Sequence, residues 1–178
     1  MLSTTFNLLK LTGACGQASG SGVGYDKLAV NLGGVTKYGK DTPISLVTVL
    51  DSNGLDDVLW CLKATLPEQN AARDKLARLL VCDYVERAFL SERAAVHEPD
   101  AASWGAIEVS RRFAHGEATQ EELVAAWVAA SGAAWVAAWG AAWEAARGAE
   151  IAWQTAHFRQ MLEASNAQDL AQYVADGD

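Results

Sequence analysis

The sequence is short of the residues that mark a secreted, metal-binding or nucleic-acid-binding protein. Only three of its 178 residues are Cys and three are Pro, and 14 Lys and Arg stand against 22 Asp and Glu. Cys15, Cys61 and Cys82 form no CxxC pair and have no His at ligand spacing. We therefore expect no disulfide framework, no metal site and a cytoplasmic location. The net charge of −8 disfavours direct binding to nucleic acid, because phosphate neutralisation requires an excess of Lys and Arg.

The negative charge is confined to one part of the chain. Residues 1–66 hold five Lys and five Asp, whereas the remaining residues hold nine Lys or Arg and 17 Asp or Glu. The composition changes at the same place, from Gly, Ser and Thr before Pro67 to Ala, Arg and Glu after it. We therefore predict an N-terminal module of short helices over residues 1–66 and an acidic helical body over residues 67–178, either separate or packed as one domain.

A tract without charged residues, 123–143, is long enough to be considered as a membrane span. It consists mostly of Ala, Gly, Ser and Trp and is flanked by Glu, so we expect no membrane insertion. We predict instead a long Ala/Trp-rich helix whose tryptophans form part of the core; a contact surface for a partner protein is the alternative. At about 100° per residue, five of them fall on less than half of the helix surface, namely Trp127, Trp135, Trp139, Trp143 and Trp153.

Start and stop signals predict short helices in the N-terminal module. We expect helices at residues 4–11, 25–32 and 55–64, the second ended by Gly33 and Gly34. Asp51 or Ser52 is expected to cap the third. Residues 44–50 are rich in β-branched side chains and fit either a strand or a helix.

The acidic body contains signals for longer helices. We expect one helix over residues 67–89, a second capped by Asp100 and running to residue 113, and a third opened by the capping box of Thr119 and Glu122. The fold class predicted is therefore mainly α, a helical bundle with a smaller helical module. The apolar stripe expected on the first of these helices is Leu76, Leu79, Leu80, Tyr84 and Leu90.

No local pattern of residues points to catalysis. The glycines between Gly13 and Gly24 lack the Gly-Lys-Ser/Thr of a phosphate-binding loop, so a flexible connector is the simpler interpretation. His97, His115 and His157 stand apart from one another, and no signature pairs them with a nucleophile. We therefore expect no enzymatic activity, no catalytic residue and no cofactor.

The best-defined polar cluster lies on two helices of the acidic body. Charges that face a core must be paired, so we predict an ion-pair network that clamps the two helices; a ligand site is the alternative. Its members are Asp83, Glu86, Arg87, Arg111 and Arg112.

Residues that contact a partner are expected on two surfaces. Lys37, Tyr38 and Lys40 form a basic and aromatic loop beside Asp41, suited to an acidic surface. The acidic body would meet a basic protein surface, and its carboxylates could imitate the phosphates of a nucleic acid. The carboxylates selected for this role are Glu108, Glu117, Glu121 and Glu122.

Several segments together resemble a known protein family. Residues 77–87 (ARLLVCDYVER), 106–114 (AIEVSRRFA) and the Ala/Trp repeat closing at 152–155 (AWQT) are similar to the predicted all-α immunity proteins of bacterial polymorphic-toxin systems. Residues 28–62, with GGVTKYG at 33–39 and DSNGLDD at 51–57, resemble a leader module joined to such proteins in phages and prophages.

The resemblance implies a small cytoplasmic protein of a bacterial host that binds and blocks another protein. The extra N-terminal module departs from the immunity-protein pattern. The resemblance therefore favours a phage or prophage inhibitor of a bacterial defence complex, comparable to an anti-CRISPR protein. Two alternatives are an immunity protein that neutralises a toxin by direct binding and a structural protein that oligomerises through the Ala/Trp-rich helix.

Overall fold

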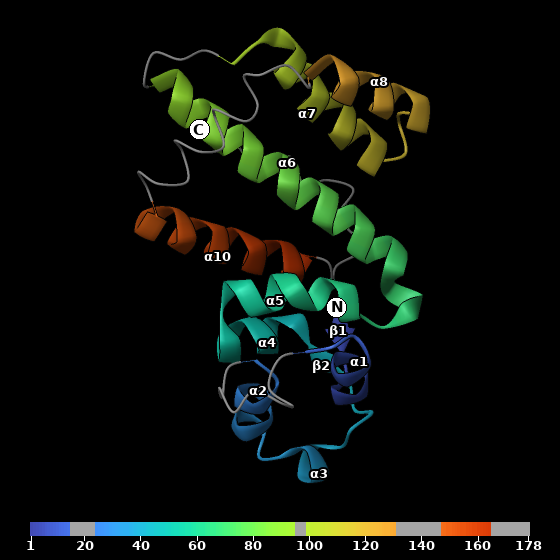
Figure 1. Cartoon of the computed structure of the whole chain (residues 1–178), viewed down its shortest axis with the longest axis vertical. Coiled ribbons are helices and arrows are strands. Elements are labelled where there is room, and N and C mark those ends of the chain that lie inside the picture. Colours follow the sequence, from blue (N-terminus) through green and yellow to red (C-terminus); the bar gives the residue numbers. More distant parts are fainter. Residues whose placement is uncertain (15–23, 95–98, 131–146, 165–178) are drawn as a thin grey trace. The chain divides into compact units, whose positions relative to one another are not determined.

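The computed structural model describes residues 1–14, 24–94, 99–130 and 147–164 (Figure 1). The chain is mainly α-helical, as predicted from the sequence, and its described residues contain one two-stranded sheet. It divides into two compact units. Unit 1 takes Met1–Asp74 and the stretch that begins at Thr155, and unit 2 takes Lys75–Gln154. Unit 1 thus extends past the expected boundary at residue 66 and includes a segment that the sequence analysis assigned to the acidic body.

Unit 1 consists of short elements. Ser3 and Thr4 pair antiparallel with Ser45 and Ile44. The 44–50 segment, which fitted strand or helix, is both: it begins as a strand and continues as a helix. In chain order the elements are β1 (Ser3–Thr4), α1 (Phe6–Leu11), α2 (Tyr25–Asn31), α3 (Val35–Tyr38), β2 (Ile44–Ser45), α4 (Leu46–Asn53), α5 (Leu55–Cys61) and two 3₁₀ turns, Leu62–Ala64 and Pro67–Gln69.

The expected cap of the third helix is wrong. Asp51 and Ser52 lie inside α4, which continues to Asn53. Gly54 separates α4 from α5 and precedes the first residue of α5, with no side-chain cap. Its φ of 96° lies in the left-handed region that side chains other than Gly rarely adopt. The chain therefore turns at the glycine, two residues later than the expected cap.

Side-chain hydroxyl groups in and next to the two strands of unit 1 cap helices and bond to the backbone. The Thr5 hydroxyl caps α1 by accepting from the Leu8 N–H at 3.1 Å, and Ser45 caps α4 in the same way at Thr48. The buried Thr4 hydroxyl donates to the Ala64 carbonyl at 2.6 Å. These bonds satisfy polar groups that burial would otherwise penalise.

The core of unit 1 is apolar and includes residues from the distant end of the chain. Arg159 of α10 (Arg147–Ala164) donates to Asp51 of α4. The same half of α10 contributes three side chains with no exposed surface, Phe158, Met161 and Leu162. The buried residues contributed by 1–74 include Leu2, Phe6, Leu9, Leu28, Ile44, Leu46, Val49, Leu50 and Val58.

Unit 2 contains the longer helices α6 (Asn70–Ala94, from Lys75 onward), α7 (Ala101–Ala114) and α8 (Gln120–Ala130). The predicted caps are confirmed. Asp100 accepts from the Ser103 N–H at 2.7 Å, and Thr119 and Glu122 exchange the two bonds of a capping box at 2.7 and 3.2 Å. Helices α7 and α8 lie side by side and are joined by a short connection (Figure 1).

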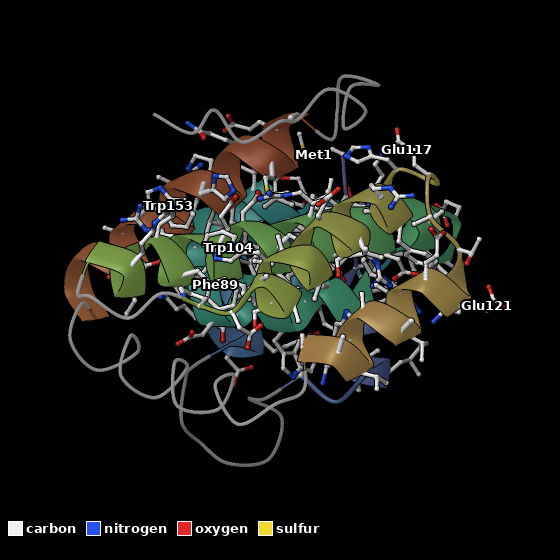
Figure 2. The ribbon with its side chains drawn as sticks, turned by 90° about the horizontal axis from the view of Figure 1, so that it is seen from above. Met1, Phe89, Trp104, Glu117, Glu121 and Trp153 are labelled. Atoms are coloured by element: carbon white, nitrogen blue, oxygen red, sulfur yellow. The ribbon has the colours of Figure 1, made fainter. Side chains whose placement is uncertain are left out.

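A small apolar cluster joins α6 to α7 in unit 2. Cys82 and Phe89 of α6 pack with Ile107 of α7, and Val85 and Trp104 cover them. The rings of Phe89 and Trp104 meet edge to face, 5.2 Å between centroids (Figure 2). The expected stripe on α6 is correct for Leu76, Leu79 and Leu80, which are buried. It is wrong for Leu90, which is 52% exposed, because the helix buries its neighbour Phe89 instead.

The expected long Ala/Trp-rich helix falls only partly on described residues. Trp127 lies on α8 and Trp153 on α10, whereas Trp135, Trp139 and Trp143 lie outside the described residues. No described helix combines the length and the apolar content that crossing a bilayer requires.

Candidate functional site

Arg111 is the centre of the charged cluster between α6 and α7. Its Nη2 lies 2.7 Å from Asp83 Oδ1 and 2.5 Å from Glu86 Oε2. Burial opposes the charge of Arg111, but the hydrogen bonds with Glu86 and Asp83 outweigh burial and raise the Arg111 pKa. The Asp83 side chain is only 5% exposed, so Arg111 compensates a carboxylate that water scarcely reaches. This part of the predicted network is present and clamps the two helices.

The other two arginines of the predicted network make different pairs. Arg87 Nε lies 2.7 Å from Glu150 Oε2, and its guanidinium stands 4.2 Å above the ring of Trp153. Arg112 Nη2 lies 3.5 Å from Glu122 Oε1 and also donates to a backbone carbonyl, that of Glu117, at 3.1 Å. Asp83, Glu86 and Arg111 therefore form one cluster. Arg87 and Arg112 pair with other carboxylates.

The pairing of Arg87 with Glu150 was missed by the sequence analysis. Glu150 is 63 residues away in the chain, and no local spacing links the two. The neighbouring Tyr84 donates its hydroxyl to the Gln154 carbonyl at 3.1 Å, and burial, with Glu150 and Asp83, raises the Tyr84 pKa. The Arg87 guanidinium thus stacks on the ring of Trp153 and is paired with the Glu150 carboxylate. These contacts indicate a structural role for Arg87.

The four candidate carboxylates do not form one cluster. Glu108 is exposed on α7. Glu117 is exposed in the turn between α7 and α8, and Glu121 is exposed in the first turn of α8 (Figure 2). Glu122 is engaged with Thr119 and Arg112. Hydrogen bonds from its own backbone N–H and from Thr119 lower the pKa of Glu121, which keeps it ionised. Glu117 and Glu121 therefore remain as exposed negative charge at one end of α8.

The expected basic and aromatic loop is partly structural. Lys37 and Lys40 are exposed. Tyr38, which ends α3, donates its hydroxyl to the Pro43 carbonyl at 3.1 Å, and its ring meets that of Phe6 edge to face at 6.0 Å. Tyr38 thus stabilises unit 1 and is half-buried, whereas the two lysines are exposed.

An exposed apolar face on α8 was not predicted as such. Val124 and Trp127 are 51% and 56% exposed, and Val128, one turn beyond Val124, is 69% exposed. Leu123 and Ala130 are buried residues of this helix, and Trp127 lies between them and Val124 around its circumference. The indole N–H of Trp127 donates to the Ser110 hydroxyl of α7 at 3.3 Å, so the ring is held in place while its surface stays open. We call Val124, Trp127 and Val128 the α8 face.

The two described thiols are poor candidates for chemistry. Burial, together with Asp57 and against the opposing effect of Lys63, raises the pKa of Cys61 to about 12. Burial, opposed by Arg111, raises that of Cys82 to about 11. Both therefore stay protonated near neutral pH and are not nucleophilic. Within the described ranges, no group of three or more His, Cys, Asp or Glu side chains could hold a metal ion.

Comparison of the chain with protein-family models, with curated proteins and with solved structures gives no match in any of the three. The resemblance to immunity proteins therefore stays a prediction. The candidate site rests on the geometry of unit 2 alone, where the α8 face and the two exposed carboxylates beside it form the best-defined accessible surface.

Proposed function

We propose that this protein acts without catalysis, by docking the α8 face on a partner protein and blocking it. The observation that carries the proposal is Trp127, a large aromatic side chain that is more than half exposed yet held by a hydrogen bond to Ser110. Exposed tryptophans dominate the energetics of many interfaces, and an anchor that is already oriented loses little entropy on binding.

The neighbouring charges indicate the chemistry of the partner. Glu117 and Glu121 are exposed next to the start of α8, and Glu121 lies on the same side of the helix as Val124 and Val128. A complementary surface would carry an apolar depression for Trp127 with Lys or Arg beside it. Such charge complementarity accelerates association and weakens with salt.

The resemblance to immunity proteins supports a more specific proposal, which concerns the kind of partner. A phage or prophage protein related to immunity proteins would act in the host cytoplasm on a bacterial defence complex, such as a CRISPR effector. Neutralisation of a toxin by direct binding is the second candidate. Nucleic-acid effectors of either kind present basic surfaces, which suit exposed carboxylates.

The test compares three proteins in cleavage assays with purified CRISPR effector complexes and with nuclease toxins. Wild type is expected to bind and inhibit one of them, and Trp127→Ala to bind roughly 30-fold more weakly, as loss of a hot spot costs about 2 kcal/mol or more. Leu11→Ala, which removes a still more exposed apolar side chain from unit 1, is the control and should bind as wild type does.

Two results would contradict the proposal at different levels. Equal inhibition by wild type and Trp127→Ala would remove the α8 face as the binding surface. Absence of binding to every effector and toxin, with a folded protein, would remove the inhibitory function. Sedimentation of the same samples at micromolar concentration checks self-association: a dimer lost in Trp127→Ala would make a second copy the occupant of the face.

A further inference from the structure

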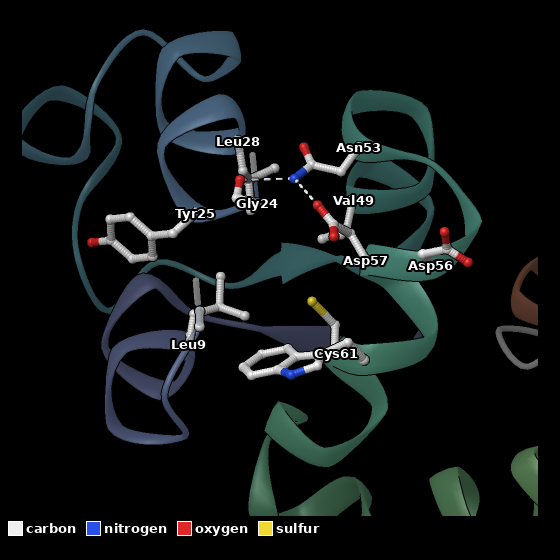
Figure 3. A pocket seen from close by; sticks show the side chains of 11 residues that line it. Leu9, Gly24, Tyr25, Leu28, Val49, Asn53, Asp56, Asp57 and Cys61 are labelled. Atoms are coloured by element: carbon white, nitrogen blue, oxygen red, sulfur yellow. Dashed lines mark hydrogen bonds between the residues drawn. The ribbon is translucent and has the colours of Figure 1, made fainter. Parts of the chain in front are cut away.

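Unit 1 contains a pocket of about 240 Å³ between α1, α2, α4 and α5 (Figure 3). Its walls are mainly apolar and include Leu9, Leu28 and Val49. Pockets for drug-sized ligands span roughly 300–1,000 Å³, so this one suits a smaller group, such as a short chain of carbon atoms with one polar end. It belongs to unit 1 and is independent of the α8 face.

One side of the pocket is polar, and the Asn53 amide donors on this side are already used. The Asn53 amide nitrogen donates both hydrogens, to the Gly24 carbonyl at 2.8 Å and to Asp57 Oδ2 at 2.7 Å (Figure 3). The Asn53 oxygen accepts from the Ser52 hydroxyl at 2.6 Å. Within the described residues, the second carboxylate oxygen of Asp57 accepts no side-chain hydrogen bond, and Asp57 forms no ion pair. The polar side therefore offers a hydrogen-bond acceptor.

The charges of the lining exclude an anion. Asp56 and Asp57 are lining residues, and no Lys or Arg is among them. Asp57 is directed toward Asn53, whereas the Asp56 carboxylate points away from the other lining side chains (Figure 3). The Cys61 sulfur points between the walls but stays protonated, so it adds no charge. A phosphate or carboxylate would meet only repulsion, and a cation would find one partner.

We propose that this pocket binds a primary alkylammonium group. The aliphatic stem would lie against Leu9, Leu28 and Val49, and the ammonium would donate to the open oxygen of Asp57. An alkylammonium supplies donors only, which matches the acceptor that Asp57 offers beside the engaged amide of Asn53. The group could be a free alkylamine or the side chain of a lysine, since the chemistry recognised is the same.

Two-dimensional NMR of the full chain tests the proposal through the side-chain amide signals of Asn53 and the backbone signal of Gly24. Titration with n-pentylamine at pH 7, where its ammonium is charged, is expected to shift both signals saturably. n-Pentanol, which has the same stem without the charge, should bind at least tenfold more weakly. A peptide with one lysine and blocked termini distinguishes the sources: tighter binding of the peptide assigns the pocket to a lysine side chain, and tighter binding of pentylamine assigns it to a free amine.

Asp57→Asn and Asp56→Asn form a matched pair of variants. Asp57→Asn is expected to lower the affinity for pentylamine at least tenfold, whereas Asp56→Asn, which alters the carboxylate that points away, should leave it unchanged. Equal loss in both variants would reduce the effect to general electrostatics and overturn the assignment of Asp57. Equal binding of pentylamine and pentanol by wild type, or no shift with any probe, would overturn the proposal without relying on a variant that folds.

Discussion

The two units of this protein are held together by different means. Unit 1 buries many apolar side chains. Side-chain hydrogen bonds satisfy its buried polar groups: the Thr4 hydroxyl donates to a backbone carbonyl, and the Gln69 amide oxygen accepts from a backbone N–H. The described part of unit 2 has a smaller apolar cluster around Phe89 and adds ion pairs centred on Arg111 and Arg87. Unit 2 also leaves the α8 face open. Both units bury apolar side chains, but in unit 2 a nearly buried carboxylate, Asp83, also has to be paired.

The difference has a physical reason. Burial of apolar surface stabilises a fold without any specific pairing of groups. An exposed ion pair contributes little, whereas removing one partner of a buried pair costs much. A helix pair fastened partly by charges can keep apolar side chains such as Val124 on its surface, because its stability does not require them inside. The surface that we propose to bind a partner and the charges that stabilise the helix pair therefore occur in the same unit.

The largest effect is expected in unit 1. Phe158→Ala should lower the free energy of unfolding by about 3–5 kcal/mol, because it removes a fully buried ring from a packed core. Urea unfolding measures the loss, and Gln160→Ala, an exposed position on the same helix, should change it by less than about 0.5 kcal/mol. Similar small losses in both variants would break the comparison, since α10 would then not belong to the core of unit 1.

A smaller loss is expected when the charge pairing of unit 2 is broken. Arg111→Met should cost about 2 kcal/mol, because it leaves Asp83 buried without a partner, although the partial exposure of Arg111 reduces the penalty. Arg112→Met, which removes an exposed contact of 3.5 Å, should cost at most about 1 kcal/mol. Adding Asp83→Asn to Arg111→Met should recover part of the loss; no recovery would contradict the assigned role of Asp83.

The smallest effect is a loss of stability at alkaline pH that arises from the two buried thiols, one in each unit. An unfolded Cys ionises near pH 9, whereas Cys61 holds its proton to about pH 12 and Cys82 to about pH 11. The unfolded state binds fewer protons in this window, so stability is intact below pH 8 and falls as the pH rises above 9.

Urea unfolding at pH 8 and pH 10.5 measures this loss. Wild type should lose about 1–2 kcal/mol more than Cys61→Ala, because the variant has no thiol at that site to ionise. Cys82→Ala should reduce the loss by less, since the folded pKa of Cys82 is the lower of the two. Equal losses in wild type and Cys61→Ala would contradict the burial of that thiol.

Features that depend on local spacing could be predicted from the sequence. The capping box of Thr119 and Glu122 needs only three residues of chain, and Asp100 caps the next helix by the same logic. The mainly helical class followed from such signals and from the distribution of apolar residues. Leu90 was placed on the wrong side because a one-residue change turns a helix by about 100°, and neighbouring elements decide which side is buried.

Features that depend on distant segments could not be predicted. Arg87 meets Glu150 across 63 residues, and nothing near either residue specifies the other. The pocket lined by Leu9, Leu28 and Asp57 requires four helices to be in place. Trp127 was expected in the core because its face is apolar; it reaches Ser110 of α7 with its indole N–H but remains 56% exposed, and the sequence alone does not show how far α7 covers it.

The membership of α10 in unit 1 has a consequence for the order of events during synthesis. Arg159 and Asp51 are partners separated by 108 residues, and Phe158 belongs to the same segment of α10. A ribosome that has just added Asp74 has released nothing that can fill the places of these side chains. Unit 1 therefore receives these side chains only after residues 75–154 have been synthesised, and until then chaperones and proteases can recognise its incomplete core.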